Sequence, residues 1–339
     1  MAMHEDGLLG AAAGGDEAAF RDLMMPLRPQ LHAHCYRMLG SVDDADEALQ
    51  EVLLRVWRGL GRFEGRSSLR SWLYRIATNV CLNLIQKRPK RVLPLDHTSS
   101  AGPHEMSSEV LVESVWIEPY PDSALAIPDA GEGPEARYEQ RESIELAFVA
   151  AIQHLPGNER AALLLREVIG FSAREVAELM EVTVPAVNSA LQRARRLVDE
   201  RGPTESQQVA LRSLGDARLR EVVDGYADAF ERGDVDALVG MLAEDATWSM
   251  PPIPDWYRGH EAIAAFLVAG PLRVRWRHVS TSANGQAAVG CYAWDAQRGC
   301  FVATVLDVLT LRGERIAAVT AFLDREVFAR FGLADVLPT

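Results

Sequence analysis

The sequence contains few cysteines and lacks long apolar runs. Cys35, Cys81, Cys291 and Cys300 form no C-x-x-C pair and lie within apolar stretches. We therefore expect reduced, packed thiols; a disulfide or metal at Cys291 and Cys300, facing each other across a hairpin, is the minor alternative. No apolar run approaches the roughly 20 residues that span a bilayer, and no signal peptide opens the chain. These absences predict a cytoplasmic protein without a membrane segment, a cofactor or a metal.

The chain as a whole also lacks positive charge. Its formal net charge of −13 argues against nonspecific nucleic-acid binding by the whole molecule. The charge is segregated, however, with ten basic and two acidic residues between Gln50 and Arg91. The stretch from Val92 to Ala136 has nine acidic residues, several prolines and no lysine or arginine. This composition predicts a flexible acidic tether between domains.

Helical periodicity dominates the first part of the chain. Residues 27–39 form an expected helix ended by Gly40, and residues 43–60 form a strongly amphipathic one. A third helix is expected over residues 69–88, closed by Pro89. This basic helical unit is separated by the acidic tether from a second helical unit at residues 137–201, ended by Gly202 and Pro203.

Residues 156–198 have the pattern of a helix-turn-helix. Ser172 is a predicted N-cap with Glu175 three residues later, residues 181–183 form the turn, and Thr183 caps the second helix. The face opposite the second helix's apolar stripe carries small and polar residues, then arginines, which suit base edges and phosphates in a major groove. An ordinary helical hairpin with a solvated face is the alternative.

The C-terminal part changes character to α+β. Helices are expected over residues 216–232, 234–243 and 260–267, and strands over residues 246–250, 273–282, 286–293, 300–311 and 315–322. There are no internal repeats.

Three segments together resemble the extracytoplasmic-function class of bacterial sigma factors: DADEALQEVLLRVWR, SSLRSWLYRIATNVCLN and LPGNERAALLLREVIGFSAREVAELMEVTVPAVNSALQRARR. The resemblance covers most of residues 16–201. It implies two all-α sigma domains, the second with the helix-turn-helix, joined by an acidic linker. The opening of residues 204–339 is similar to SnoaL-like proteins, whose cone wraps helices against a curved antiparallel sheet. The implied domains are 1–91 (sigma domain two), 92–136 (linker), 137–202 (sigma domain four) and 203–339 (SnoaL-like).

The sigma resemblance assigns roles to three sets of residues. Core polymerase would dock on Asp43, Asp46, Glu47, Gln50, Glu51 and Arg55, although such charges can also be merely solvated. The minus-ten element would meet Arg66, Arg70, Trp72, Tyr74, Arg75, Asn79, Asn83, Lys87 and Arg88, which supply cations, aromatic rings and amides for unstacked bases. At Trp72 a core position is the stronger interpretation. The minus-thirty-five element would meet Arg174, Thr183, Val184, Pro185, Asn188, Ser189, Gln192, Arg193 and Arg196. The linker either mimics RNA in the polymerase cleft or is simply solvated.

The cone offers candidate pocket residues: Trp248, Met250, Trp256, Tyr257, Arg258, His260, His278 and Tyr292, with Asp245, Asp307 and Asp324 as carboxylates. A general acid–base pair would need a carboxylate or histidine with a shifted pKa in an apolar cavity, whereas a lone one is more often structural. The regulatory motif of sigma factors with such a domain, an aspartate followed by consecutive glycines, is not visible here.

The leading prediction is a transcription initiation factor that binds core RNA polymerase and promoter DNA, catalyses nothing itself, and is modulated by its C-terminal domain. One alternative is a SnoaL-like isomerase or hydrolase fused to a DNA-binding module. Another is an ordinary repressor or activator, which has no need of the unit at residues 43–88 and usually dimerises. A ligand in the cone and a separate anti-sigma protein are further partners that the sequence leaves open.

Overall fold

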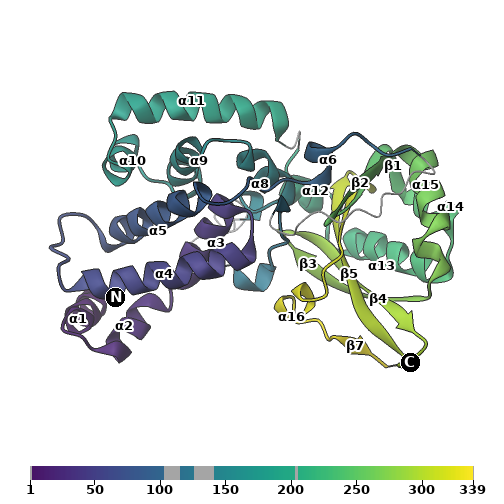
Figure 1. The fold of residues 1–339 in the computed structure, drawn as a ribbon, viewed down its shortest axis with the longest axis horizontal. Helices are drawn as coiled ribbons and strands as arrows, with labels where there is room; N and C mark the ends of the chain where they lie inside the picture. The colour runs from purple at the N-terminus through teal and green to yellow at the C-terminus, as the bar shows by residue number, and fades with distance from the viewer. Residues whose placement is uncertain (1, 103–114, 126–140, 203–204, 339) are drawn as a thin grey trace. The chain divides into compact units, whose positions relative to one another are not determined.

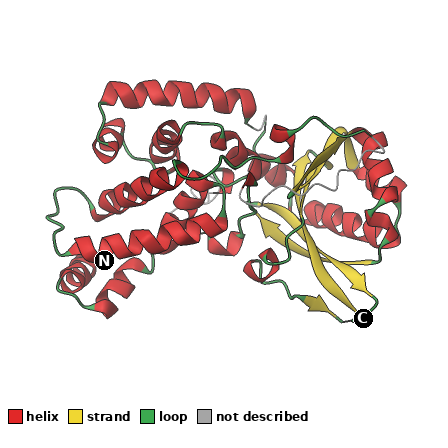
Figure 2. Cartoon of the chain, viewed as in Figure 1, coloured by secondary structure: helices red, strands yellow, loops and turns green. Residues whose placement is uncertain are grey.

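The computed structural model describes residues 2–102, 115–125, 141–202 and 205–338 (Figure 1). The chain divides into two compact units. The first comprises Met1–Arg91, Ala124–Ser143 and Ala147–Gly202, and its described part is helical (Figure 2). The second comprises Val92–Ser123, Ile144–Leu146 and Pro203–Thr339, and it combines helices with a sheet.

Five described helices form the N-terminal part of the first unit, and three of them begin at a side chain that caps them. The five helices are α1 (Ala2–Ala13), α2 (Glu17–Met24), α3 (Arg28–Leu39), α4 (Val42–Leu60) and α5 (Leu69–Ile85). Ser41 and Ser68 accept backbone N–H bonds at the starts of α4 and α5, and Gly40 ends α3 in the left-handed region at φ 73°. The expected helices are confirmed, but α5 ends before residue 88 because Pro89 disfavours helical backbone at the residue before it.

The second set of helices contains the predicted helix-turn-helix. It consists of α8 (Leu146–Gln153), α9 (Gly157–Leu163), the π-helical turn η3 (Leu164–Val168), α10 (Ala173–Met180) and α11 (Val184–Arg201). Ser172 and Glu175 form a complete capping box at α10. Glu181 turns the chain at φ 56°, and Thr183 caps α11. The predicted bounds and caps of both helices are confirmed.

Buried polar contacts join the two sets of helices within the first unit. Arg37 on α3 donates to the Ser143 carbonyl at 3.0 Å and to the Ser143 hydroxyl at 2.8 Å. The buried guanidinium of Arg160 on α9 donates to the Met38 carbonyl and, at 2.9 Å, to the Gln153 carbonyl. These carbonyls lie at the C-terminal ends of α3 and α8, where a cation is favourable. The two ranges predicted as separate sigma domains therefore pack together in this structure.

The second unit has a mixed sheet with helices packed against it (Figure 1). Its helices are α12 (Gln207–Leu214), α13 (Asp216–Arg232), α14 (Val235–Met241), α15 (Gly259–Ala269) and α16 (Val327–Arg330), with the short η4 (Pro271–Arg273). Its strands are β1 (Leu242–Met250), β2 (Ile253–Arg258), β3 (Trp276–Ala283), β4 (Gln286–Asp295), β5 (Cys300–Arg312), β6 (Arg315–Phe322) and β7 (Val336–Leu337).

The strand order is β2-β1-β6-β5-β4-β3, with β7 paired to β5. The expected antiparallel sheet is wrong at one pair, because β1 runs parallel to β6. Strand β2 was not predicted, since it contains Pro254 and proline argues against a strand assignment. The register aligns Cys300 with Asp295 and Cys291 with Val305, so the two cysteines do not face each other.

The expectation of a free tether over residues 92–136 is corrected for its described parts. These parts include α6 (Pro94–His97) and η2 (Asp122–Ala124). Trp116, Ile117 and Tyr120 are buried. The Trp256 indole donates to the Thr98 carbonyl at 2.9 Å, and the Tyr120 N–H donates to the Asn284 side chain at 2.8 Å. The acidic composition predicted solvation, but residues 92–102 and 115–123 belong to the same compact unit as the C-terminal sheet, with the side chains of Trp116, Ile117 and Tyr120 buried.

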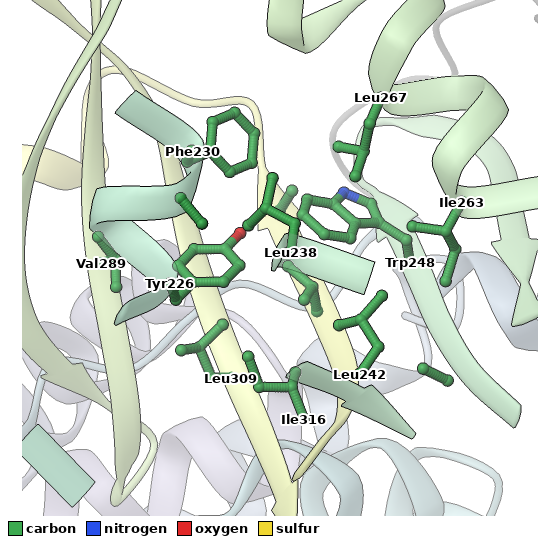
Figure 3. Close-up of a cluster of buried hydrophobic side chains, with 14 of the residues drawn as sticks. Tyr226, Phe230, Leu238, Leu242, Trp248, Ile263, Leu267, Val289, Leu309 and Ile316 are labelled. Carbon is green, nitrogen blue, oxygen red and sulfur yellow. The ribbon is translucent and has the colours of Figure 1, made fainter. Parts of the chain in front are cut away.

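The core of the second unit lies between its helices and the sheet (Figure 3). Trp248 from β1 packs near Tyr226 and Phe230 of α13, with ring centroids 6.3 and 6.2 Å away. Ile263 and Leu267 of α15 lie on the other side of the indole (Figure 3). Aromatic rings therefore occupy the centre of this core.

Candidate nucleic-acid and protein interfaces

The six residues predicted to dock core polymerase share one surface of α4. Asp43, Asp46, Glu47, Gln50 and Arg55 are exposed, and Glu51 is half-buried. They are brought together because the opposite stripe, including Val52 and Val56, is fully buried against the neighbouring helices. We call this surface the α4 face.

Leu54 also belongs to the α4 face and was not predicted. Its side chain is 49% exposed among charged neighbours, next to Arg55, which pairs with Glu51 at 2.6 Å. An exposed large apolar side chain inside a charged row is typical of a protein-binding surface. The signal was present in the sequence, since Leu54 falls outside the helix's apolar stripe.

Most residues predicted for the minus-ten element line the accessible side of α5 and the loop before it. Arg66, Arg70, Asn79, Asn83 and Lys87 are exposed, while Arg75 and Arg88 are half-buried. A pocket of about 500 Å³ opens here. Arg62, Arg66, Arg75 and three serines line one side of it, and Glu175, Glu178 and Leu179 of α10 line the other. In the free chain the basic loop thus faces carboxylates of the helix-turn-helix.

Tyr74 is a correction to the predicted set. Its side chain is 3% exposed, and its ring packs edge-on against His34 and Phe171, with centroids 5.3 and 5.6 Å away. The Tyr74 ring is therefore core in this structure. Trp72 is half-buried and packs on Phe63 at 5.1 Å, in agreement with the core interpretation.

Arg70 is engaged by the segment that precedes the helix-turn-helix. Its guanidinium lies 5.1 Å above the Phe171 ring and donates to the Ile169 carbonyl at 2.9 Å. Phe171 was not predicted as a partner, because no local pattern connects it to a residue about 100 positions earlier. A DNA phosphate would compete with these contacts for Arg70.

All nine residues predicted for the minus-thirty-five element are exposed. Val187, Leu191 and Ala194 are buried on the opposite side of α11, which leaves Asn188, Ser189 and Gln192 directed outward. Arg193 pairs with Glu159 of α9 at 2.6 Å and keeps 55% of its side chain exposed. We call this surface the α11 face; its geometry suits insertion into a major groove.

The predicted pocket residues of the C-terminal unit do not form one site. Trp248 lies in the central core, and Met250 is buried in the same cluster. Tyr257 stacks on Phe266 at 4.6 Å. Elsewhere, Arg258 lies over the Trp256 ring, His260 contacts the carbonyls of Leu242 and Ala243, and Tyr292 packs on Phe328 of α16.

One buried polar cluster does form in this core, and it centres on Asp307. The Tyr226 hydroxyl donates to the Asp307 carboxylate at 2.7 Å, and the Cys291 thiol donates to it at 3.2 Å. Burial raises the pKa of Asp307 to about 6, against the opposing effect of these two hydrogen bonds. Tyr226 and Cys291 were missed, since each is typical of an apolar core position. The side chains of Asp245 and Asp324 are on the surface.

His278 is a further buried ionisable group of the C-terminal unit. Its side chain is fully buried, packs against Phe230 and contacts Glu231 at 3.3 Å. Burial lowers its pKa, and Glu231 opposes that shift.

Across the described part of the chain, no cluster of three or more histidine, cysteine or acidic side chains has a metal-binding arrangement. Among the described helices, none is both long and apolar enough to cross a bilayer.

Comparison with known families and proteins identifies what three parts of the chain are similar to. Family models of Sigma-70 region 2, Sigma-70 region 4 and a SnoaL-like domain match residues 23–91, 145–198 and 223–319. The ECF RNA polymerase sigma factor SigG of Mycobacterium tuberculosis is 40% identical over 324 residues, covering 92% of this chain and 83% of the relative. The RNA polymerase sigma-H factor of Pseudomonas aeruginosa is 31% identical, covering 55% of this chain and 87% of that protein.

A solved structure resembles the chain over most of its length. The crystal structure of the Mycobacterium tuberculosis extracytoplasmic function sigma factor SigJ matches with a TM-score of 0.58 and 21% identity. The match covers 91% of this chain and 98% of that one. At this identity it shows the shared fold of helical units followed by an α+β unit.

Proposed function

This chain belongs to the extracytoplasmic-function RNA polymerase sigma factors, and we propose that it docks core polymerase with the α4 face and reads DNA with the α11 face. As a sigma factor it directs promoter-specific initiation, and a SnoaL-like domain forms its C-terminal part. Its partners in this role are core RNA polymerase and promoter DNA, with which it acts in the cytoplasm.

The observation that carries the DNA assignment is the α11 face. Nine residues predicted from sequence are all exposed along α10, the turn and α11, while the buried stripe fixes which side of the helix is presented. Small and amide side chains occupy the first turns, and Arg193 and Arg196 follow. This order matches a recognition helix that meets bases with its N-terminal end and phosphates further along.

The C-terminal domain, in this proposal, restrains initiation by holding the linker. Residues 92–102 and 115–123 fold onto it through the Trp256–Thr98 and Tyr120–Asn284 hydrogen bonds. A linker held in this way is unavailable to pass through the polymerase cleft. Releasing it therefore increases productive holoenzyme.

Run-off transcription with core polymerase and a set of genomic promoter fragments tests both the sigma function of the two faces and the restraint by the linker. The native chain is expected to give discrete promoter-specific transcripts that core alone does not give. Trp256→Phe removes the indole N–H that binds the Thr98 carbonyl and keeps a ring, so output per molecule should rise about two- to fivefold, as for the loss of one hydrogen bond of about 0.5–1 kcal/mol.

Trp294→Phe is the matched control. Trp294 packs on Phe301 and Arg275 and makes no described contact with residues 92–123. If both tryptophan variants change output equally, the restraint by the linker contact is wrong. If no fragment yields a specific transcript and core binding is absent, the sigma assignment of the two faces fails.

We also propose that the chain catalyses no small-molecule reaction. The centre of the C-terminal core is occupied by Tyr226, Phe230, Trp248 and Phe266. The second candidate, a SnoaL-like enzyme or ligand sensor, is favoured by Asp307, because a buried carboxyl whose pKa is about 6 suits proton transfer. Turnover by the native chain that Asp307→Asn abolishes would establish it. Copurification of a dedicated inhibitor would add an anti-sigma partner.

A further inference from the structure

Arg88 connects the DNA-facing end of the first helical unit to the α4 face. It lies just beyond α5, and its guanidinium reaches back to two carboxylates of α4. One is Asp44, and the other is Glu47, whose Oε2 is 2.6 Å from the Arg88 Nη2. Arg88 is thus a candidate phosphate-binding residue that, in the free chain, is occupied by acidic residues of the docking helix.

The two carboxylates differ in how firmly they are held. Asp44 is 11% exposed and also binds Arg91 at 2.8 Å, so it is a fixed anchor inside the structure. Glu47 is 61% exposed and stands in the row of the α4 face between Asp46 and Gln50. An exposed ion pair contributes only about 0.2–1 kcal/mol, so a cation from a docking partner can replace Arg88 at Glu47.

From this geometry we propose that Glu47 is a positioning residue that couples docking to DNA binding. In the free chain Glu47 holds Arg88 against α4. When a basic side chain of the docked polymerase pairs with Glu47, the Arg88 guanidinium is released on that side and binds a phosphate of the promoter. Asp44 remains bound to Arg91 and keeps the segment after α5 in place. This inference rests on the proposed function of the α4 face.

Replacement of Arg88 by a polymerase side chain at Glu47 predicts whether each variant affects the free chain or the holoenzyme. Glu47→Gln removes the ion pair at the Arg88 Nη2 atom in the free chain, while Asp44 keeps its contact with Nη1. The Nη2 side of Arg88 therefore gains a phosphate contact without polymerase. In the holoenzyme that phosphate contact already exists, so Glu47→Gln adds no further contact there. Because Glu47 belongs to the α4 face, this variant also weakens core binding, and core is raised to saturation for each variant separately. Arg88→Ala removes the contact from the holoenzyme and leaves the free chain unaffected.

The experiment measures binding of the full-length chain to a promoter fork with a duplex minus-thirty-five element and a single-stranded minus-ten element. Binding is measured over a range of salt concentrations, with and without saturating core polymerase. Each phosphate contact contributes about 0.7–0.9 to the slope of log affinity against log salt. Glu221→Gln is the matched control, because Glu221 is 63% exposed and pairs with Arg218 at 2.6 Å far along the chain in α13.

For the free chain, Glu47→Gln should steepen the slope of log affinity against log salt (the salt slope) by about 0.7–0.9. It should also tighten binding to the fork about two- to fivefold. Adding Arg88→Ala should abolish both gains. In the holoenzyme, Arg88→Ala alone should make the slope shallower by about 0.7–0.9, and Glu221→Gln should match the native chain in every condition.

The inference would be overturned if, without polymerase, Glu47→Gln and the native chain bound the fork with the same affinity and the same salt slope. It would also be overturned if Arg88→Ala left the salt slope of the holoenzyme unchanged. The proposed function fails separately, if native chain with core polymerase shows no specific affinity for the fork.

Discussion

At the residue scale, two buried ionisable groups give the two units opposite responses to pH. Burial next to Arg37 lowers the pKa of His34 to about 3, so stability of the helical unit is lost as pH falls below about 6.5. Burial raises the pKa of Asp307 to about 6, so its carboxyl is favoured in the protonated form. Its contribution is complete below about pH 4 and is lost as pH rises through 6.

Asp307→Asn tests the second of these effects. Asparagine keeps an acceptor oxygen for Tyr226 and Cys291 but carries no charge at any pH. The native C-terminal unit should lose roughly 3 kcal/mol of unfolding free energy between pH 4 and pH 7, and the variant should lose almost none. Hydrogen exchange of amides in β5, followed across this pH range, measures the difference.

The helical unit supplies the internal control. Helix α5 carries Thr78, the partner of His34, and its amides should be equally protected from hydrogen exchange in both proteins. A variant whose β5 amides keep the native pH dependence would show that Asp307 is ionised at little cost, contrary to its buried position.

At the scale of single elements, α4 carries the proposed interface with core polymerase. Leu54→Asp places a charge at the exposed apolar position of the α4 face and should weaken binding to core polymerase about tenfold or more. Fluorescence anisotropy with labelled core measures it. Met25→Asp is the matched control, since Met25 is 62% exposed in the same unit and lies outside α4. Equal losses for both variants would remove Leu54 from the interface.

The sequence was most informative where an element carries its own start and stop signals. Ser172, Glu175 and Thr183 specify the helix-turn-helix, and α13 and β6 match their expected bounds. The sequence was least informative where the burial of a residue depends on segments distant along the chain. Tyr74 is buried by Phe171, and the linker is held by Trp256 and Asn284, partners that no local pattern reveals.

The candidate sites follow the same division. The α4 and α11 faces depend on helical periodicity and could be read directly, whereas the Asp307 cluster joins three different elements. Tyr226, Cys291 and Asp307 come from α13, β4 and β5, so only the fold brings them together. The residues of the expected pocket are dispersed for the same reason: Trp248 and Met250 lie in the central core, whereas Tyr292 packs on Phe328 of α16.

At the scale of the whole molecule, one acidic chain is proposed to bind two DNA elements at once. The net charge of −13 opposes binding except where basic surface is gathered, at residues 50–91 and along α11. If both surfaces bind DNA while the chain is held on one polymerase, the two promoter elements must lie at a fixed distance and in a fixed rotational phase.

Open-complex formation on promoters of altered spacing is the measurement that tests this most directly. The native chain with core polymerase should melt the minus-ten region of its promoter, as permanganate reactivity of thymines reports, and core alone should not. Inserting five base pairs between the two elements rotates one by about half a turn and should abolish melting. Equal melting at both spacings would contradict simultaneous recognition of two elements by this chain.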